Sequence, residues 1–300
     1  MKRITTFQIQ ERKERDEQIV MLTAYDALSA SLAEQAGIDF LLVGDSLGMV
    51  VLGYDSTVPV TIEDIIHHTK PVITSTKRAH VVADMPFGTY QSGWQDAMKN
   101  ATRIMKETGA SSVKLEGGVR IAETVEKLVQ SGIPVMGHIG LTPQSVNTLG
   151  GHKIQGTTPR SAVKLISDAK SLEEAGAFSV VLETIPAALS HMITTRLSIP
   201  TIGIGAGPYC SGQVQVFHDI LGLYKDFNPK HARKFVDAGQ LLSNAINEYK
   251  AAVEDKSFPS SDESFFMEDR NIELIQKMIN NETPSDVIEN SSTVNQSQEH

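Results

Sequence analysis

The chain has 300 residues, 40% of them hydrophobic, which suits one (β/α)8 barrel of about 250 residues with an appendage. The formal net charge is −9, but residues 254–300 hold eleven acidic and three basic residues, so the rest of the chain is nearly neutral. A nearly neutral body without a clustered basic face excludes a surface for nucleic acid.

From Val20 onward, short apolar runs alternate with longer helix-like stretches. Each apolar run is rich in β-branched residues and ends in polar residues or glycine, which is typical of buried strands. The expected strands are, in chain order, IVMLTAYD, FLLVGDS, HVVADMP, SSVKLEGG, PVMGHIG, FSVVLETIP, PTIGIGAG and VQVFHD. The expected helices are Ala27–Gln35, Ile62–Thr76, Ser92–Glu107, Ala122–Gln130, Ser161–Ala175 and Ala187–Leu197.

Repeated strand-then-helix units predict a parallel sheet covered by helices, and eight units favour a closed (β/α)8 TIM barrel. A doubly wound sheet is the alternative, but it needs a glycine-rich turn after the first strand, where TAYDAL has none. We expect the barrel over residues 1–258 and an acidic, polar C-terminal tail over residues 259–300. Within the tail, Ile272–Ile279 is expected to form a short amphipathic helix, and the last 20 residues to be disordered.

The chain has one cysteine, Cys210, and this number bears on the cellular compartment. It excludes an intramolecular disulfide and a cysteine-rich zinc site, and it fits a reducing compartment. The first 18 residues lack the apolar core of a secretory signal, and no apolar run approaches the ~18 residues of a transmembrane helix. We therefore expect a cytoplasmic protein that binds no membrane.

Ionisable residues stand where the expected strands end, and strand ends converge at one rim of a barrel. Because strand side chains alternate, Lys114 and Glu116 share a face, and the same rule pairs Val43 with Asp45. A single aspartate there more often caps a helix, and a single histidine more often belongs to the core. Such residues on five consecutive strands nevertheless predict an active site. They are Asp45, Asp84, Lys114, Glu116, His138 and Glu183.

Three of these residues, Asp45, Asp84 and Glu116, offer hard oxygen donors. Such a set suits Mg²⁺ held partly through water better than Zn²⁺. The alternative is a carboxylate cluster that shares protons without a metal, with the large pKa shifts that stacked like charges force.

Two loop segments carry weaker signals. The glycines of Gly203–Gly207 either cradle an anion on backbone amides or only permit a tight turn. The segment Ile139–Pro159 is long for a connection between strand and helix, which predicts an active-site lid hinged at Gly150 and Gly151.

Several local sequences resemble the signature blocks of the ketopantoate hydroxymethyltransferase family, and the likeness covers about Ile19 to Lys250. The blocks are VGDSLGM (Val43–Met49), ADMPF (Ala83–Phe87), VKLEGG (Val113–Gly118), GHIGLTPQSV (Gly137–Val146) and GIGAG. The resemblance implies a TIM barrel of the phosphoenolpyruvate/pyruvate type. It also implies transfer of a hydroxymethyl group from 5,10-methylenetetrahydrofolate to 3-methyl-2-oxobutanoate, which forms 2-dehydropantoate in pantothenate biosynthesis.

The resemblance further implies roles for individual residues. One Mg²⁺ per subunit stabilises an enolate and is bound by Asp45, Asp84 and Glu116. The keto acid is bound by Asp45, Ser46, Asp84 and Lys114, with His138 at a further active-site position.

The general base implied by the family is Glu183, in VLETIP. We expect it to take the C3 proton from the side of the rim opposite the three metal-site carboxylates; the alternative is that Glu183 caps the helix after Pro186. The family also implies a homo-oligomer, commonly a decamer, and it often has histidine where this chain has Glu263.

Three other functions stay open. A Schiff-base aldolase would use Lys114, although nearby Glu116 favours the charged form of the lysine. A related metal-dependent keto-acid lyase or mutase would need no folate, but this sequence lacks the K-x-C-G-H run of the lyases. A non-catalytic barrel is the third possibility, and the intact acid, base and metal groups speak against it.

Overall fold

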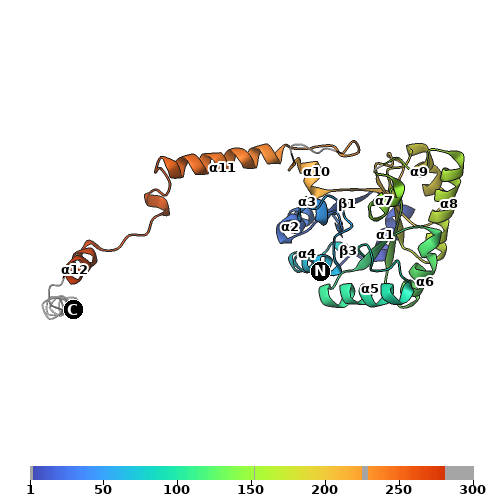
Figure 1. Cartoon of the computed structure of the whole chain (residues 1–300), viewed down its shortest axis with the longest axis horizontal. Helices are drawn as coiled ribbons and strands as arrows, with labels where there is room; N and C mark the ends of the chain where they lie inside the picture. Colours follow the sequence, from blue (N-terminus) through green and yellow to red (C-terminus); the bar gives the residue numbers. More distant parts are fainter. Residues whose placement is uncertain (1–2, 152, 225–228, 281–300) are drawn as a thin grey trace. The chain divides into compact units, whose positions relative to one another are not determined.

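The computed structural model describes residues 3–151, 153–224 and 229–280. Eight parallel strands close into a barrel in chain order, with β8 hydrogen-bonded back to β1 (Figure 1). The strands are β1 (Ile19–Thr23), β2 (Phe40–Val43), β3 (His80–Asp84), β4 (Ser112–Glu116), β5 (Val135–Gly140), β6 (Ser179–Glu183), β7 (Thr201–Ile204) and β8 (Gly212–Gln215). This confirms the predicted (β/α)8 barrel.

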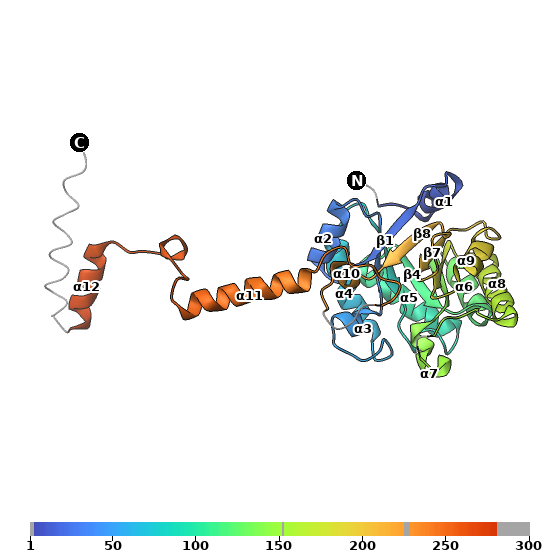
Figure 2. The ribbon, with the colours of Figure 1, turned by 90° about the horizontal axis from the view of Figure 1, so that it is seen from above.

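Helices surround the strands, as the two views of Figures 1 and 2 show. Four of them begin at a residue (Thr5, Asp26, Thr61 or Thr158) whose side chain accepts the N3 backbone N–H in a capping box. The helices of the first unit are α1 (Thr6–Glu14), α2 (Ala27–Gln35), α3 (Leu47–Val50), α4 (Ile62–Ser75), α5 (Trp94–Thr108), α6 (Ala122–Gln130), α7 (Val146–Leu149), α8 (Pro159–Glu174), α9 (Ala187–Thr194) and α10 (Phe217–Leu221).

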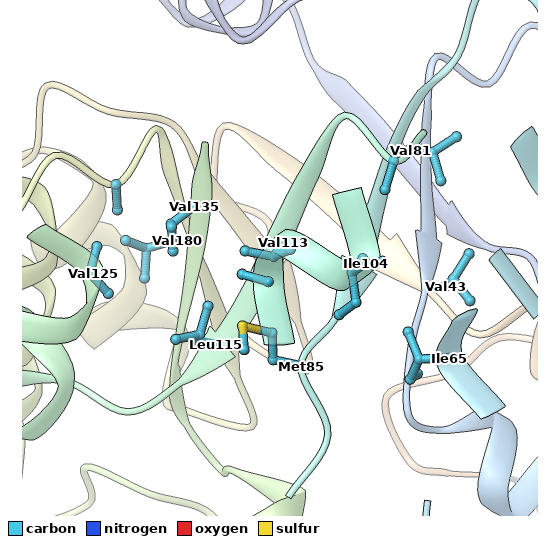
Figure 3. Close-up of a cluster of buried hydrophobic side chains, with 14 of the residues drawn as sticks. Val43, Ile65, Val81, Met85, Ile104, Val113, Leu115, Val125, Val135 and Val180 are labelled. Carbon is cyan, nitrogen blue, oxygen red and sulfur yellow. The ribbon is translucent and has the colours of Figure 1, made fainter. Parts of the chain in front are cut away.

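The larger core lies between the strands and the helices. In Figure 3, Ile65 of α4, Ile104 of α5 and Val125 of α6 lie among side chains from the outer face of the barrel. The strand residues in this cluster include Val113 and Leu115, both fully buried. Because strand side chains alternate, Lys114 and Glu116 point into the barrel, as the sequence predicts.

A second core fills the amino-terminal end of the barrel. The buried side chains of this cluster come from the inner faces of the strands and from Ile9 of α1. The Lys13 ammonium group anchors α1 by donating to the carbonyls of Leu197 (2.6 Å) and Ile199 (2.8 Å). His80 Nδ1 lies 2.9 Å from the Ile4 carbonyl, beside the start of α1. Helix α1, which was not among the helices expected from the sequence, closes this end of the barrel.

One expectation from strand alternation is wrong. Val43 packs in the outer cluster, so it does not share a face with Asp45, which lines the cavity at the other end of the barrel. The physical reason is that β2 ends at Val43, and the chain turns at Gly44 before it reaches Asp45. A Cβ atom at Gly44 would lie 2.9 Å from Ser46 Oγ, so a larger residue at this turn would displace the Ser46 hydroxyl.

The second unit begins at Leu241 and is described by itself. It contains most of α11 (Ala238–Glu254), a 3-10 turn at Ser261–Glu263 and α12 (Asp269–Ile279), which includes the predicted helix Ile272–Ile279. The predicted disorder of the last 20 residues falls outside the described residues. No described helix is long and apolar enough to cross a membrane.

Candidate active site

A cavity of about 770 Å³ lies at the carboxyl ends of the strands. The structure brings all the ionisable residues singled out from the sequence to its wall. These residues, together with the predicted substrate contact, are Asp45, Ser46, Asp84, Lys114, Glu116, His138 and Glu183. The remainder of the wall is mainly apolar, with side chains such as Met49, Leu141 and Val181. An enclosure of this size fits a drug-sized ligand, for which cavities of roughly 300–1,000 Å³ are usual.

Lys114 forms a buried ion pair with Asp84. Its Nζ lies 3.0 Å from Asp84 Oδ1 and 4.0 Å from Glu116 Oε1, and its side chain is 4% exposed. Burial alone would lower the pKa of Lys114, but the charges of Asp84, Glu116 and Asp45 outweigh it and raise the pKa. Lys114 is therefore a fixed positive charge at the cavity wall.

Asp45 and Asp84 lie side by side at the ends of β2 and β3. The Asp45 backbone N–H donates to Asp84 Oδ2 at 2.9 Å. Burial raises the pKa of the Asp45 carboxyl well above its usual range, and the negative charges of Asp84 and Glu116 raise it further. Burial also raises the pKa of Asp84, although Lys114 opposes this shift. The charge of Lys114 therefore compensates the two carboxylates only in part.

His138 connects two carboxylates on the neighbouring strands. Its Nδ1 lies 3.4 Å from Glu116 Oε1, and its Nε2 lies 3.1 Å from Glu183 Oε2. Burial and the positive charge of Lys114 lower the pKa of His138, but the close carboxylates of Glu116 and Glu183 outweigh them and raise it to about 9. Lys114 Nζ also approaches Nδ1, at 3.2 Å. We read that contact as an approach of like charges, since both ring nitrogens face carboxylates.

This arrangement corrects the expected place of Glu183. Consecutive strands pair directly, with Glu116 opposite His138 and Gly140 opposite Glu183. Glu183 is therefore separated from Glu116 by one histidine ring, rather than lying on the opposite side of the rim. Its side chain is 15% exposed, compared with 3% for His138, so it is the more accessible of the two.

Two residues that the sequence analysis missed hold these groups in place. The Gln144 side chain donates to Asp45 Oδ2 at 2.8 Å, and its backbone N–H donates to Glu116 Oε2 at 3.1 Å. The Tyr90 hydroxyl lies 2.8 Å from Gln144 Oε1 and accepts from the Glu116 backbone N–H at 3.0 Å. The only sequence signal for Gln144 is its place in the block GHIGLTPQSV, and Tyr90 has none.

Ser46 contributes a hydroxyl to the wall next to Asp45. Its Oγ lies 2.8 Å from the hydroxyl of Tyr25, a fully buried side chain. Burial raises the pKa of Tyr25, so its hydroxyl stays protonated at neutral pH. Tyr25 can therefore donate to Ser46, which leaves the Ser46 proton available to a ligand.

The donor chemistry at the cavity wall fits a hard divalent cation. Asp45 and Asp84 supply carboxylate oxygens whose mutual repulsion such a cation relieves, and there is no cysteine among them. Glu116 Oε2 accepts the Gln144 backbone N–H, whereas the buried Glu116 Oε1 accepts no hydrogen bond within the described part of the chain. As the side chains stand, no three His, Cys, Asp or Glu residues within the described ranges form a metal cluster. The fit therefore rests on two carboxylates, with Glu116 acting through water.

The two loop segments singled out from the sequence, Gly203–Gly207 and Ile139–Pro159, have different structural roles. Gly205 and Gly207 have positive φ angles of 64° and 76°, and a Cβ atom at Gly207 would lie 2.4 Å from Ala187 Cβ. These glycines serve a tight turn against α9, as the simpler interpretation has it. In the expected lid, Gly150 ends α7 with a φ of 69°, and Ile154 lines the cavity. Its opening and closing stay a prediction.

Comparisons with known proteins agree with these observations. The sequence profile of ketopantoate hydroxymethyltransferase matches residues 3–261. The 3-methyl-2-oxobutanoate hydroxymethyltransferase of Carboxydothermus hydrogenoformans is 55% identical over 275 residues, which are 92% of this chain and 100% of that relative. The enzyme of the same name from Dehalococcoides mccartyi is 53% identical over 280 residues, 93% of this chain and 99% of the relative.

Among solved structures, the phosphoenolpyruvate phosphomutase of Streptomyces platensis superposes with a TM-score of 0.56 at 14% identity. The superposition covers 92% of this chain and 96% of that one. At this identity the likeness supports the (β/α)8 barrel fold alone.

Proposed function

The chain belongs to the ketopantoate hydroxymethyltransferase family, and from this premise we propose how its cavity carries out the transfer. The acceptor is 3-methyl-2-oxobutanoate, the one-carbon donor is 5,10-methylenetetrahydrofolate, and the product is 2-dehydropantoate. The methylene carbon and one water molecule supply the new hydroxymethyl group, and tetrahydrofolate is released. The observation that carries the proposal is the chain of contacts from Glu116 through His138 to Glu183, beside the Lys114–Asp84 ion pair.

Glu183 is the group that removes the C3 proton of the keto acid. It lines the cavity and is the most accessible member of the contact chain. The neighbouring carboxylates of Glu116 and Glu183 raise the pKa of His138 to about 9, which disfavours the histidine as the base near neutral pH. The histidine instead acts as a positioning residue that holds the Glu183 carboxylate in one orientation.

Lys114 and Ser46 bind and orient the keto acid. The keto acid is an anion, and Lys114 is the fixed positive charge in the interior of this wall. The Ser46 hydroxyl, held by Tyr25, donates one hydrogen bond. Asp45 and Asp84 would repel an anionic substrate unless their charges are compensated, which again points to a cation at this place.

We propose that the cation is Mg²⁺, one per subunit, held by Asp45 and Asp84 directly and by Glu116 through water. When bound, it polarises the keto oxygen as a Lewis acid and makes the neighbouring C–H bond more acidic. Gln144 keeps the Asp45 and Glu116 carboxylates at their places on the wall. Folate as the co-substrate is likewise proposed, on the names of the family and its relatives.

The Schiff-base alternative is disfavoured by the electrostatics of Lys114. A nucleophilic lysine needs a lowered pKa, whereas the carboxylates around Lys114 raise its pKa. The ion pair with Asp84 at 3.0 Å also occupies the ammonium group. A keto-acid lyase or mutase of the same fold is set aside because the family match covers the whole barrel.

The proposed function is tested by a turnover assay. The protein is incubated with 3-methyl-2-oxobutanoate and 5,10-methylenetetrahydrofolate, with Mg²⁺ or with excess chelator. Formation of 2-dehydropantoate that requires both substrates and the divalent ion is the expected result. Turnover without folate, or undiminished turnover with chelator, would contradict the proposed co-substrate or the proposed ion.

We further propose a cytoplasmic homo-oligomer, a decamer by resemblance to the family. Helix α11 supports an assembly, because apolar side chains recur along one of its faces at Leu242, Ile246, Tyr249 and Val253. All four are exposed, between 44% and 66%. Such a stripe is normally buried against another surface. A sedimentation run that shows only a 32.7 kDa species would contradict the proposal.

A further inference from the structure

Asp219 is a charged residue of the cavity wall that the proposed mechanism does not use. It lies in α10, the short helix that follows β8. In the closed order of the strands, β8 stands opposite β4, which carries Lys114 and Glu116. Asp219 is 8% exposed and lines the same cavity. The Asp219 carboxylate therefore stands across the cavity from Lys114 and Glu116.

The Asp219 carboxylate has no direct partner among the described residues: it accepts no hydrogen bond and forms no ion pair there. Burial raises its pKa, and the positive charge of His231 opposes this shift only from a distance. Asp219 lies in the first turn of α10, but its side chain accepts no hydrogen bond from the described backbone N–H groups there. Burying a charged group without partners is costly, so this position calls for a ligand that supplies donors.

The two proposed substrates offer only one group that suits a carboxylate. The keto acid is an anion, and so is the glutamate tail of the folate, and Asp219 would repel both. The pterin ring carries an N–H and an adjacent NH₂ on one edge, and these parallel donors match a carboxylate as the two N–H groups of arginine do. Ile204 of β7, Val214 of β8 and Val216, the residue after β8, supply apolar wall for a flat ring.

We propose that Asp219 binds the aminopyrimidinone edge of the pterin ring of the folate co-substrate through two parallel N–H···O hydrogen bonds. This inference rests on the proposed function and adds a specificity-determining residue to it. The pterin then occupies the β7–β8 side of the cavity, and the keto acid the β2–β6 side. The reacting carbons meet between them, and a volume of about 770 Å³ is ample for both.

The test measures the affinity of the protein for tetrahydrofolate by calorimetry, without turnover. Asp219→Asn keeps the shape but replaces one acceptor oxygen by a donor that faces the pterin donors. We expect affinity to fall by about 10- to 100-fold, the range for a lost hydrogen bond to a charged group. The control is Asp237→Asn, the same change at an exposed aspartate, which should bind like the wild type.

A second ligand, 2-desamino-tetrahydrofolate, removes the NH₂ donor instead of the acceptor. We expect it to bind the wild-type protein about tenfold more weakly than tetrahydrofolate, and Asp219→Asn with little further loss. The comparison on the wild type alone does not depend on the folding of any variant. Equal affinities of the wild type for the two ligands, or an equal penalty in wild type and variant, would overturn the proposal.

Exchange of the keto-acid C3 proton with deuterium separates this inference from the proposed function, because that half-reaction uses no folate. If the wild type shows neither exchange nor turnover, the proposed function fails, whatever Asp219 does. If the wild type exchanges, and Asp219→Asn loses exchange and tetrahydrofolate affinity to the same extent, Asp219 belongs to the keto-acid site. That result would overturn the inference and leave the proposed function standing.

Discussion

His138 Nε2 lies 3.1 Å from Glu183 Oε2, and the other nitrogen of the same ring lies 3.4 Å from Glu116 Oε1. A ring held between two carboxylates on neighbouring strands cannot rotate without breaking both contacts. The same contacts raise the pKa of His138 to about 9 against burial and Lys114, so the ring remains an imidazolium at neutral pH. Of these three groups, Glu183 has the most exposed side chain, at 15% compared with 3% for His138 and 2% for Glu116.

Asp84→Asn should abolish the stabilisation of the folded protein by Mg²⁺. Wild-type protein should unfold at a higher temperature when Mg²⁺ is added, because an ion that binds only the folded state stabilises it by mass action. The amide of the variant is a much weaker donor to a hard cation. Thermal unfolding with and without Mg²⁺ measures this, and Asp55→Asn at an exposed position is the control. An unchanged Mg²⁺ response in Asp84→Asn would remove Asp84 from the proposed site.

Borohydride should leave Lys114 unmodified in the presence of the keto acid. The charges of Asp84, Glu116 and Asp45 hold the lysine in its ammonium form, which is not a nucleophile. Mass spectrometry of the reduced protein is the measurement, and no adduct of the keto acid is expected. An adduct on a peptide containing Lys114 would revive the Schiff-base mechanism.

Gln144→Leu should lower kcat/KM by tenfold or more. The variant loses the side-chain bond to Asp45, and a hydrogen bond to a charged group contributes about 1.5–3 kcal/mol. The backbone N–H that donates to Glu116 remains, so the fold should persist. Because the residue positions a proposed metal carboxylate, the apparent Mg²⁺ affinity should fall as well. Gln130→Leu, at an exposed position on α6, is the control. A Gln144→Leu variant with wild-type Mg²⁺ affinity would contradict the positioning role.

His80 should make the barrel less stable as the pH falls from about 6.5 to 4. Burial lowers the pKa of His80 to about 4. Between about pH 6.5 and 4, His80 therefore binds a proton in the unfolded chain but not in the folded one, which favours unfolding. At 1.36 kcal/mol per pKa unit, the loss amounts to about 3 kcal/mol. Urea unfolding at several pH values measures it. His80→Gln should lose less stability over the same window, and an equal loss in both proteins would contradict the assignment.

Much of the fold followed from the spacing of apolar runs, because each β-branched run is buried on both faces of a parallel strand. Helix α1 was not predicted, because its sequence TFQIQERKE is polar and Ile9 is the one buried residue in it. Its place depends on contacts of Lys13 with carbonyls more than 180 residues away, which no local pattern reveals.

The site was predictable where a residue sits on a strand. Lys114, Glu116 and Glu183 follow from alternation, and the structure places them in the cavity. The orientation of Asp45 did not follow from alternation, because strand β2 ends at Val43 and the chain turns at Gly44. Gln144, like Tyr90 and Asp219, lies outside the strands, so its approach to the site is set by tertiary packing rather than by sequence period.

The most direct test of the account is deuterium exchange at C3 of 3-methyl-2-oxobutanoate by Glu183→Gln, followed by NMR in the absence of folate. Glutamine keeps the shape of the side chain and removes its basicity, so keto-acid binding should persist while exchange falls by at least a factor of about 100. Glu174→Gln, at an exposed position on α8, should exchange like the wild type. If Glu183→Gln exchanges at close to the wild-type rate, Glu183 is not the base and the proposed mechanism is wrong.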